Sequence, residues 1–171
     1  AEVAMKALQA GAHLVNDITA LYGDPKMGEV VVEANASTIL MHMQGTPKNM
    51  QDNPSYVDVV EDVKTFFRAK LDELEKLGVE DVVLDPGFGF GKTLEDNFKI
   101  LRSLNEFKSF DLPILSGVSR KSMIYKSLGC EAEDSLNGTT ALNIISAANG
   151  ACLLRVHDIA EAREVSILHN H

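Results

Sequence analysis

Five short apolar runs, separated by segments with helical periodicity, constrain the fold of this 171-residue chain more than any other feature. Short strands without a polar face are typical of a parallel sheet, because crossover helices cover both of its faces. The alternation therefore predicts an α/β protein with about five parallel strands and flanking helices. The predicted strands are residues 13–18, 37–44, 81–85, 113–118 and 151–157.

The segments between these runs carry apolar residues at helical spacing. The longest, residues 56–77, places Val59, Val63 and Phe67 on one side and is closed by Gly78. We find no interdomain linker, so one domain covering residues 1–171 is predicted. The other helices are expected at residues 1–10, 26–35, 94–107, 119–128, 134–149 and 158–168.

The composition excludes several classes of protein. With 45% hydrophobic and 24% charged residues, the chain is near the globular average. Its 16 basic and 25 acidic residues give a net charge of -9, which argues against general binding to nucleic acid. No apolar run approaches the roughly 18 residues of a membrane span. Cys130 and Cys152 lie far apart and fit a reducing compartment, so a cytoplasmic protein is predicted.

Polar side chains follow every apolar run. They include Asn16, His42, Asp85, Lys121 and Arg155. Because the carboxyl ends of parallel strands meet on one side of a sheet, these side chains are expected to converge. One such residue alone could simply end a strand or cap a helix, but five together favour a binding site.

Asp85 is the strongest single candidate for a ligand-binding residue, because it ends the apolar run Val-Val-Leu and a buried carboxylate needs a partner. A ligand with a cyclic amidine or guanidine-like pair of N–H groups would satisfy it. Lys121, Arg155 and His157 bring cationic groups to the same place, and a helix predicted to be capped by Asp158 adds its N-terminus. This predicts an anion site, with phosphate as the natural ligand. The alternative for Arg155 is an ion pair with a carboxylate across the site.

The glycine-rich loop at residues 85–93 resembles two nucleotide motifs but fits neither. P-loop spacing would require a glycine at Pro86, and a dinucleotide fingerprint would require one at Lys92. The glycines are expected to let the backbone and Phe90 approach a flat ligand. The five histidines and two cysteines show no zinc-ligand spacing.

The number of strands bears on the architecture. A complete (β/α)8 barrel takes about 250 residues. Five strands in 171 residues therefore match a barrel without its first three strands. An open, doubly wound five-stranded domain is the alternative.

Several segments together resemble the dihydropteroate synthases, in that family's order and at its spacing through essentially the whole chain. The resemblance implies a partial TIM barrel, running from about the fourth strand onward, in which residues 1–171 form a pterin-binding domain. We accordingly expect these residues alone to be a piece of a longer enzyme, or weakly stable. The segments are NDI at 16–18, MHMQGTP at 41–47, LDPGFGFGKT at 84–93, SRKS at 119–122 and RVHD at 155–158.

The resemblance also implies an activity. It would be a transferase of folate biosynthesis that joins p-aminobenzoate to 6-hydroxymethyl-7,8-dihydropterin pyrophosphate, with Mg²⁺ as cofactor. The products would be 7,8-dihydropteroate and pyrophosphate, and sulfonamides would compete with p-aminobenzoate. The family's Asn ligand for Mg²⁺ lies in a segment with no counterpart here, so no metal ligand is assigned. The family is often dimeric, which makes a homodimer a further expectation.

Residue roles follow from the same resemblance. Ser119 would bind p-aminobenzoate, and Arg155 and His157 would bind the pyrophosphate. Catalytic roles are expected for Asp85, Lys121 and Arg155. Contacts with the pterin are expected from Asn16, Met41, Asp85, Phe90, Gly117, Lys121 and Arg155.

Two other functions stay open. A pterin-binding methyltetrahydrofolate:corrinoid methyltransferase-like barrel shares the Asn-Asp and Asp-Pro strand ends but needs no pyrophosphate site. The SRKS and RVHD segments therefore favour the synthase. A non-catalytic binding or assembly fragment is the other alternative, supported by the missing first strands.

Overall fold

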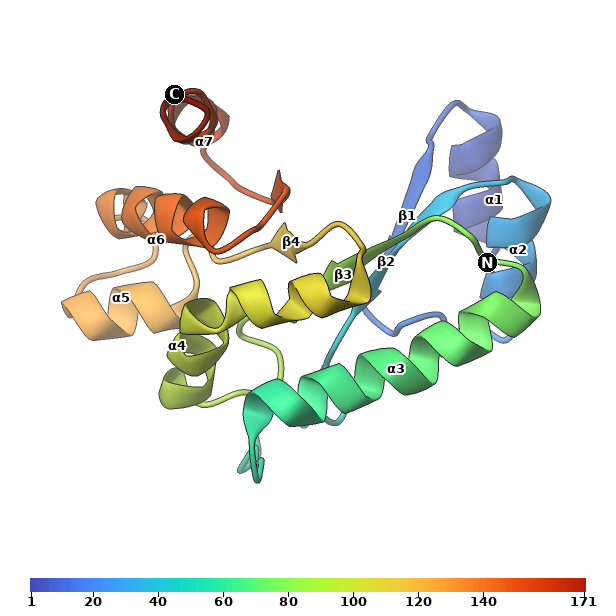
Figure 1. Ribbon diagram of the computed structural model, residues 1–171, viewed down its shortest axis with the longest axis horizontal. Coiled ribbons are helices and arrows are strands. Elements are labelled where there is room, and N and C mark those ends of the chain that lie inside the picture. The colour runs from blue at the N-terminus through green and yellow to red at the C-terminus, as the bar shows by residue number, and fades with distance from the viewer.

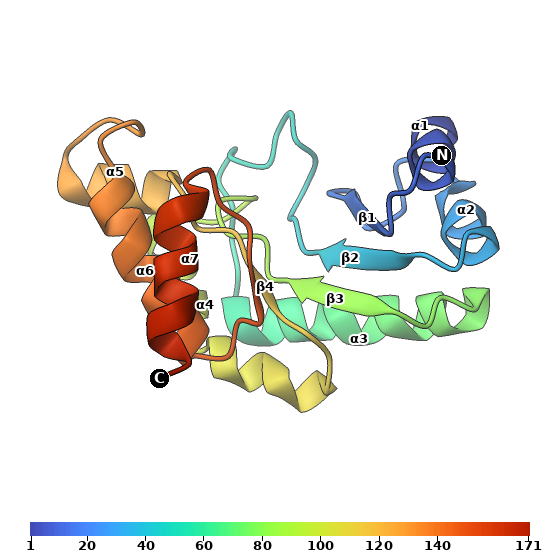
Figure 2. The ribbon, with the colours of Figure 1, turned by 90° about the horizontal axis from the view of Figure 1, so that it is seen from above.

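The computed structural model describes residues 1–171, in which five short strands alternate with helices (Figure 1). The first and last helices lie at opposite ends of the molecule in both views (Figures 1 and 2). The elements are α1 (Glu2–Gln9), β1 (Leu14–Asp17), α2 (Met27–Glu33), β2 (Ser37–Met41), α3 (Val59–Leu77), β3 (Val82–Asp85), α4 (Leu94–Arg102), the 3-10 helix η1 (Leu104–Phe110), β4 (Leu115–Ser116), α5 (Ser122–Leu128), α6 (Leu136–Ala148), β5 (Leu153–Leu154) and α7 (Ile159–His169).

All strand pairs are parallel, as predicted. β1, β2 and β3 form one sheet in chain order, and β4 pairs with β5. A single parallel bridge between Leu84 and Ile114 joins the two parts. The expected single sheet is therefore interrupted, because β4 and β5 have only two residues each in regular pairing. Figure 2 shows β2 and β3 side by side with α3 running along them.

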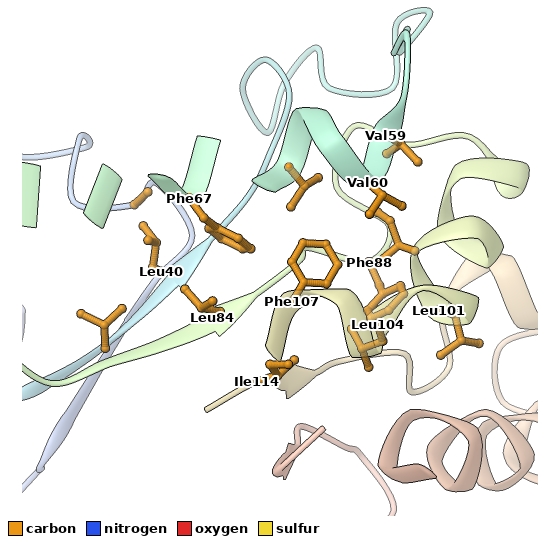
Figure 3. Packing of buried hydrophobic residues seen from close by; sticks show 14 of the residues in the cluster. Leu40, Val59, Val60, Phe67, Leu84, Phe88, Leu101, Leu104, Phe107 and Ile114 are labelled. Carbon is orange, nitrogen blue, oxygen red and sulfur yellow. The ribbon is translucent and has the colours of Figure 1, made fainter. Parts of the chain in front are cut away.

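One face of the sheet carries the main hydrophobic core. Leu40 and Leu84 point from β2 and β3 toward Phe67 of α3 and Phe107 of η1, all of them fully buried (Figure 3). α3 begins where the Asp58 side chain accepts the backbone N–H groups of residues 60 and 61, and it ends at a left-handed glycine. The long helix predicted from apolar spacing is thereby confirmed.

The opposite face carries a smaller cluster formed by Ile39, Val83 and Leu115. Because side chains alternate along a strand, Met41 and Asp85 lie two residues further along β2 and β3 on this same face. The carboxyl ends of these strands thus present a hydrophobic floor followed by a buried carboxylate.

Two local expectations need correction. The helix predicted over 94–107 divides, since α4 ends at Arg102 and the chain continues as the tighter η1. The last strand is also not buried on both faces: Leu153 keeps 37% of its surface exposed. β5 pairs only with β4, so its other edge has no neighbouring strand to cover it.

Candidate active site at the carboxyl ends of the strands

The centre of the candidate site is an ion pair between Asp85 and Arg155. Asp85 ends β3 with 1% of its surface exposed, and Arg155 directly follows β5. Arg155 Nη2 lies 2.9 Å from Asp85 Oδ2, and the backbone N–H of Gly87 donates to Oδ1 at 2.8 Å. The alternative for Arg155, an ion pair across the site, is therefore what the structure contains.

This ion pair leaves hydrogen-bonding capacity unused. Asp85 Oδ2 and Arg155 Nη1 are buried and have no hydrogen-bond partner, although Oδ2 lies 2.9 Å from Arg155 Nη2 in the ion pair. A buried acceptor of this kind is costly unless a further donor reaches it. The site can thus accept an N–H group at Asp85 and offer a donor from Arg155.

Met41 and Gly117 lie beside this pair. Met41 is buried and is the register partner of Asp85. A Cβ at Gly117 would lie 2.7 Å from Arg155 Nη2, so any larger residue would displace the guanidinium. Gly117 was expected to admit a ligand; in this structure the space above it holds Arg155.

Lys121 and Phe90 form the second part of the site. Lys121 Nζ lies 4.6 Å from the centroid of the Phe90 ring and donates to the carbonyl oxygen of Phe88. The pKa of Lys121 is lowered to about 8, mainly by burial; the charge of Asp85 raises it and that of Arg155 lowers it. The amine therefore lies within electrostatic reach of the central ion pair.

Ser119 and His157 form the third part. Ser119 Oγ lies 2.9 Å from His157 Nδ1, and the backbone N–H of His157 donates to the same hydroxyl at 3.2 Å. Ser119 is buried whereas His157 is exposed. The loops after β4 and β5 are thus joined next to the central ion pair.

Asp158 does not act as predicted. It occupies the position before α7, but its side chain makes no capping hydrogen bond. Its two oxygens instead accept Arg120 Nε at 2.9 Å and Nη2 at 2.7 Å, and Arg120 also donates to the carbonyl of Glu133. A bidentate guanidinium–carboxylate pair provides two parallel charge-assisted hydrogen bonds between opposite charges. Sequence analysis assigned Arg120 no role, although it lies between the assigned Ser119 and Lys121.

Asn16 is the predicted site residue that the structure does not join to the others. Asn16 lies on β1 opposite Ile39 of β2, whereas Asp85 lies on β3 opposite Met41 of β2. The two side chains are therefore on the same face of the sheet, but Asp85 lies two residues further along the strand direction than Asn16. Asn16 is exposed, and its side chain makes no hydrogen bond to another site residue. A cavity of about 370 Å³ between the ends of β1 and β2 is lined by Met41 but not by Asn16.

No three side chains among His, Cys, Asp and Glu gather closely enough to hold a metal ion. None of the helices combines the length and apolar character needed to cross a membrane.

Comparison with known proteins defines the class. The family model described as pterin binding enzyme matches residues 1–157, so the chain belongs to this family. Its relatives are dihydropteroate synthases. That of Escherichia coli is 43% identical over 165 residues, which cover 95% of this chain and 58% of the relative. That of Haemophilus influenzae is 40% identical, covering 96% and 60%.

Solved structures agree with these relatives. The Yersinia pestis dihydropteroate synthase, in a sulfonamide drug complex, superposes with a TM-score of 0.96 at 39% identity, covering 99% of this chain and 62% of that one. The Thermus thermophilus enzyme in complex with 6HMPPP gives 0.93 and 39%, covering 99% and 68%. The chain thus spans about three-fifths of the first relatives' length. The predicted partial barrel and the family resemblance are confirmed.

Proposed function

We propose that this chain carries the pterin, p-aminobenzoate and pyrophosphate contacts of a dihydropteroate synthase, with residues 1–171 as its pterin-binding domain. The reaction would condense 6-hydroxymethyl-7,8-dihydropterin pyrophosphate with p-aminobenzoate. One observation carries the proposal: the buried Asp85 at the end of β3 pairs with Arg155 after β5, and Lys121 after β4 contacts Phe88 and Phe90 of the loop that follows Asp85. The similarity to dihydropteroate synthases supports it.

The unsatisfied acceptor at Asp85 explains how a pterin would be gripped. A pterin presents an N–H group and an amino group side by side, which a carboxylate can accept together. Phe90 and Met41 would pack near its ring, with Gly117 below and Asn16 at its edge. Arg155 would keep Nη1 for the adjoining pyrophosphate. These roles account for a carboxylate that is otherwise costly to bury.

The cationic groups explain how the leaving group would depart. Lys121 has a pKa of about 8 and is therefore mostly protonated at neutral pH. Together with Arg155 and His157, it would stabilise the negative charge that develops on pyrophosphate as its bond to the pterin methylene breaks. Fixed charges of this kind are usually the largest contribution to catalysis. The amino group of p-aminobenzoate, held near Ser119, would then attack the methylene carbon.

Some expectations go with this proposal. Mg²⁺ would neutralise charge on the pyrophosphate when bound, but no step here is assigned to it. Sulfonamides would compete near Ser119. A cytoplasmic location agrees with the two free cysteines. A homodimer stays a prediction.

Calorimetric titration of the 171-residue chain with the pterin pyrophosphate tests the proposal. Saturable binding is expected, and Lys121→Ala should weaken it by about tenfold more than it weakens binding of the plain pterin. That difference separates the synthase from a methyltransferase-like barrel, which needs no pyrophosphate site. Absence of binding by chain shown to be folded by circular dichroism would refute the proposal. Pyrophosphate release in the presence of p-aminobenzoate distinguishes catalysis from binding alone.

A further inference from the structure

Lys92 is a buried cation that the proposed reaction does not use. It belongs to the Gly-Lys-Thr sequence after β3, which resembles the end of a P-loop, yet only 4% of its surface is exposed. Its Nζ lies 2.9 Å from His42 Nδ1, 2.9 Å from the carbonyl oxygen of Gly87 and 3.0 Å from that of Phe90. A P-loop lysine reaches out to phosphate; this one points beneath its own loop.

Burial lowers the pKa of Lys92 to about 7, so at pH 6 the side chain is mostly an ammonium and its contacts constrain the protonation of His42. An ammonium group has three donors, and Lys92 Nζ has three acceptors within 3.0 Å and a fourth, the carbonyl oxygen of His42, at 3.4 Å. Where Lys92 is an ammonium, His42 accepts at Nδ1, and the neutral imidazole then carries its proton on Nε2. In agreement, burial and the charge of Lys92 lower the pKa of His42 to about 3. The donors of Lys92 are therefore fully occupied by the protein.

The two loop carbonyls that Lys92 contacts belong to Gly87 and Phe90, which lie where the pterin is proposed to bind. Gly87 donates its backbone N–H to Asp85, and Phe90 places its ring under Lys121. Gly87 has φ of +72°, and a Cβ there would overlap the carbonyl oxygen of His42, so the loop lies directly on the end of β2. Lys92 thus connects the loop to β2 at the two points that orient the Asp85 carboxylate and the Phe90 ring.

We propose that Lys92, with His42 as its acceptor, is a positioning residue for pterin recognition. It fixes the loop at residues 86–91 so that Asp85 and Phe90 keep the geometry that a pterin ring requires. This inference rests on the proposed function, since it concerns the same ligand. Lys92 touches neither the pterin nor the pyrophosphate in this assignment; it acts through Gly87 and Phe90.

Binding measurements on Lys92→Met test this, with Lys126→Met as the control because Lys126 is an exposed helix lysine. The probes are 6-hydroxymethyl-7,8-dihydropterin and inorganic pyrophosphate, titrated at pH 6 and low temperature into chains shown to be folded by circular dichroism. We expect Lys92→Met to lose about tenfold in pterin affinity and less than about threefold in pyrophosphate affinity. The control should change neither. Equal loss of both ligands, or no loss, would overturn the proposal.

A second measurement applies if Lys92→Met does not fold. Nitrogen-15 spectra of the unaltered chain should show His42 neutral and protonated on Nε2 at pH 6. His42→Asn keeps an acceptor near the Nδ1 position, so it should bind pterin better than His42→Leu. A proton on Nδ1, or equal pterin affinity of the two variants, would refute the role. Failure of the unaltered chain to bind pterin would instead refute the proposed function.

Discussion

The loops after β3 and β4 each end in a lysine, and the two lysines are held in opposite ways. Lys92 has its three donors on protein acceptors, whereas Lys121 has one backbone carbonyl and the face of Phe90. Burial lowers both pKa values, to about 7 for Lys92 and about 8 for Lys121. The pKa shift alone therefore does not separate the two. The number of occupied N–H donors does separate them, because only Lys121 retains a donor that a ligand could use.

The largest expected effect is on stability. Lys92→Met would leave the Phe90 carbonyl and an imidazole nitrogen buried without a donor, and the Gly87 carbonyl would keep only the backbone N–H of Phe90. We therefore expect the free energy of unfolding to fall by about 3 kcal/mol. Lys121→Met removes a cation with fewer partners and should lower it by less than about 1 kcal/mol. Urea unfolding of both variants measures the difference. Equal losses of unfolding free energy would show that the two lysines do not differ in how firmly the protein holds them.

Asp85 is contacted by the β3 loop through Gly87 and by Arg155, which follows β5. Asp85→Asn replaces one acceptor oxygen by a donor amide, so pterin affinity should fall by about thirtyfold, or about 2 kcal/mol. Calorimetric titration with the plain pterin measures this. Retained affinity would show that the ligand does not use the unsatisfied oxygen.

The pH dependence of stability sharpens the description of the β3 loop. The pKa of His42 is lowered from 6.5 to about 3, so between these values the unfolded chain binds a proton that the folded chain does not. Stability should therefore fall as pH falls below 6.5, with a contribution of at most about 1.4 kcal/mol per pH unit from this group. Urea unfolding of His42→Gln between pH 7 and 4.5 should show a correspondingly shallower decline. The exposed His169→Gln serves as control and should follow the unaltered chain.

The smallest expected effect concerns the β4 loop. Arg120 is joined to Asp158 by two hydrogen bonds and adopts a left-handed φ of +52°. Arg120→Lys keeps the charge but loses the paired geometry, so we expect a loss of about 1 kcal/mol in stability. Thermal unfolding measures it, with Arg102→Lys at an exposed ion pair as the control. Equal shifts in both variants would show that the Arg120 pair contributes no more than a surface pair.

Much of the fold could be predicted from local patterns. The apolar spacing of residues 56–77 gave α3, and short apolar runs gave five parallel strands. The chemistry of the site was also visible, since Asp85 ends one strand and Arg155 directly follows another. Such features depend on neighbours a few residues away, which the sequence displays directly.

Contacts between distant segments could not be predicted in the same way. Asp158 was expected to cap α7 but pairs with Arg120, which is 38 positions away. Lys92 gave no sign of facing His42, 50 positions away. Each side chain had a plausible local role, and only the close approach of two loops decided against it.

The sequence by itself determined the class of fold, the end of the sheet at which polar groups gather and the chemical types present there. The tertiary structure decided which cation pairs with which acceptor: Arg155 with Asp85, Arg120 with Asp158, and Lys92 with His42 and its own loop. The reason is physical. Hydrophobic periodicity is a property of consecutive residues, whereas an ion pair or a hydrogen bond depends on distances of about 3 Å that exist only after the strands have aligned.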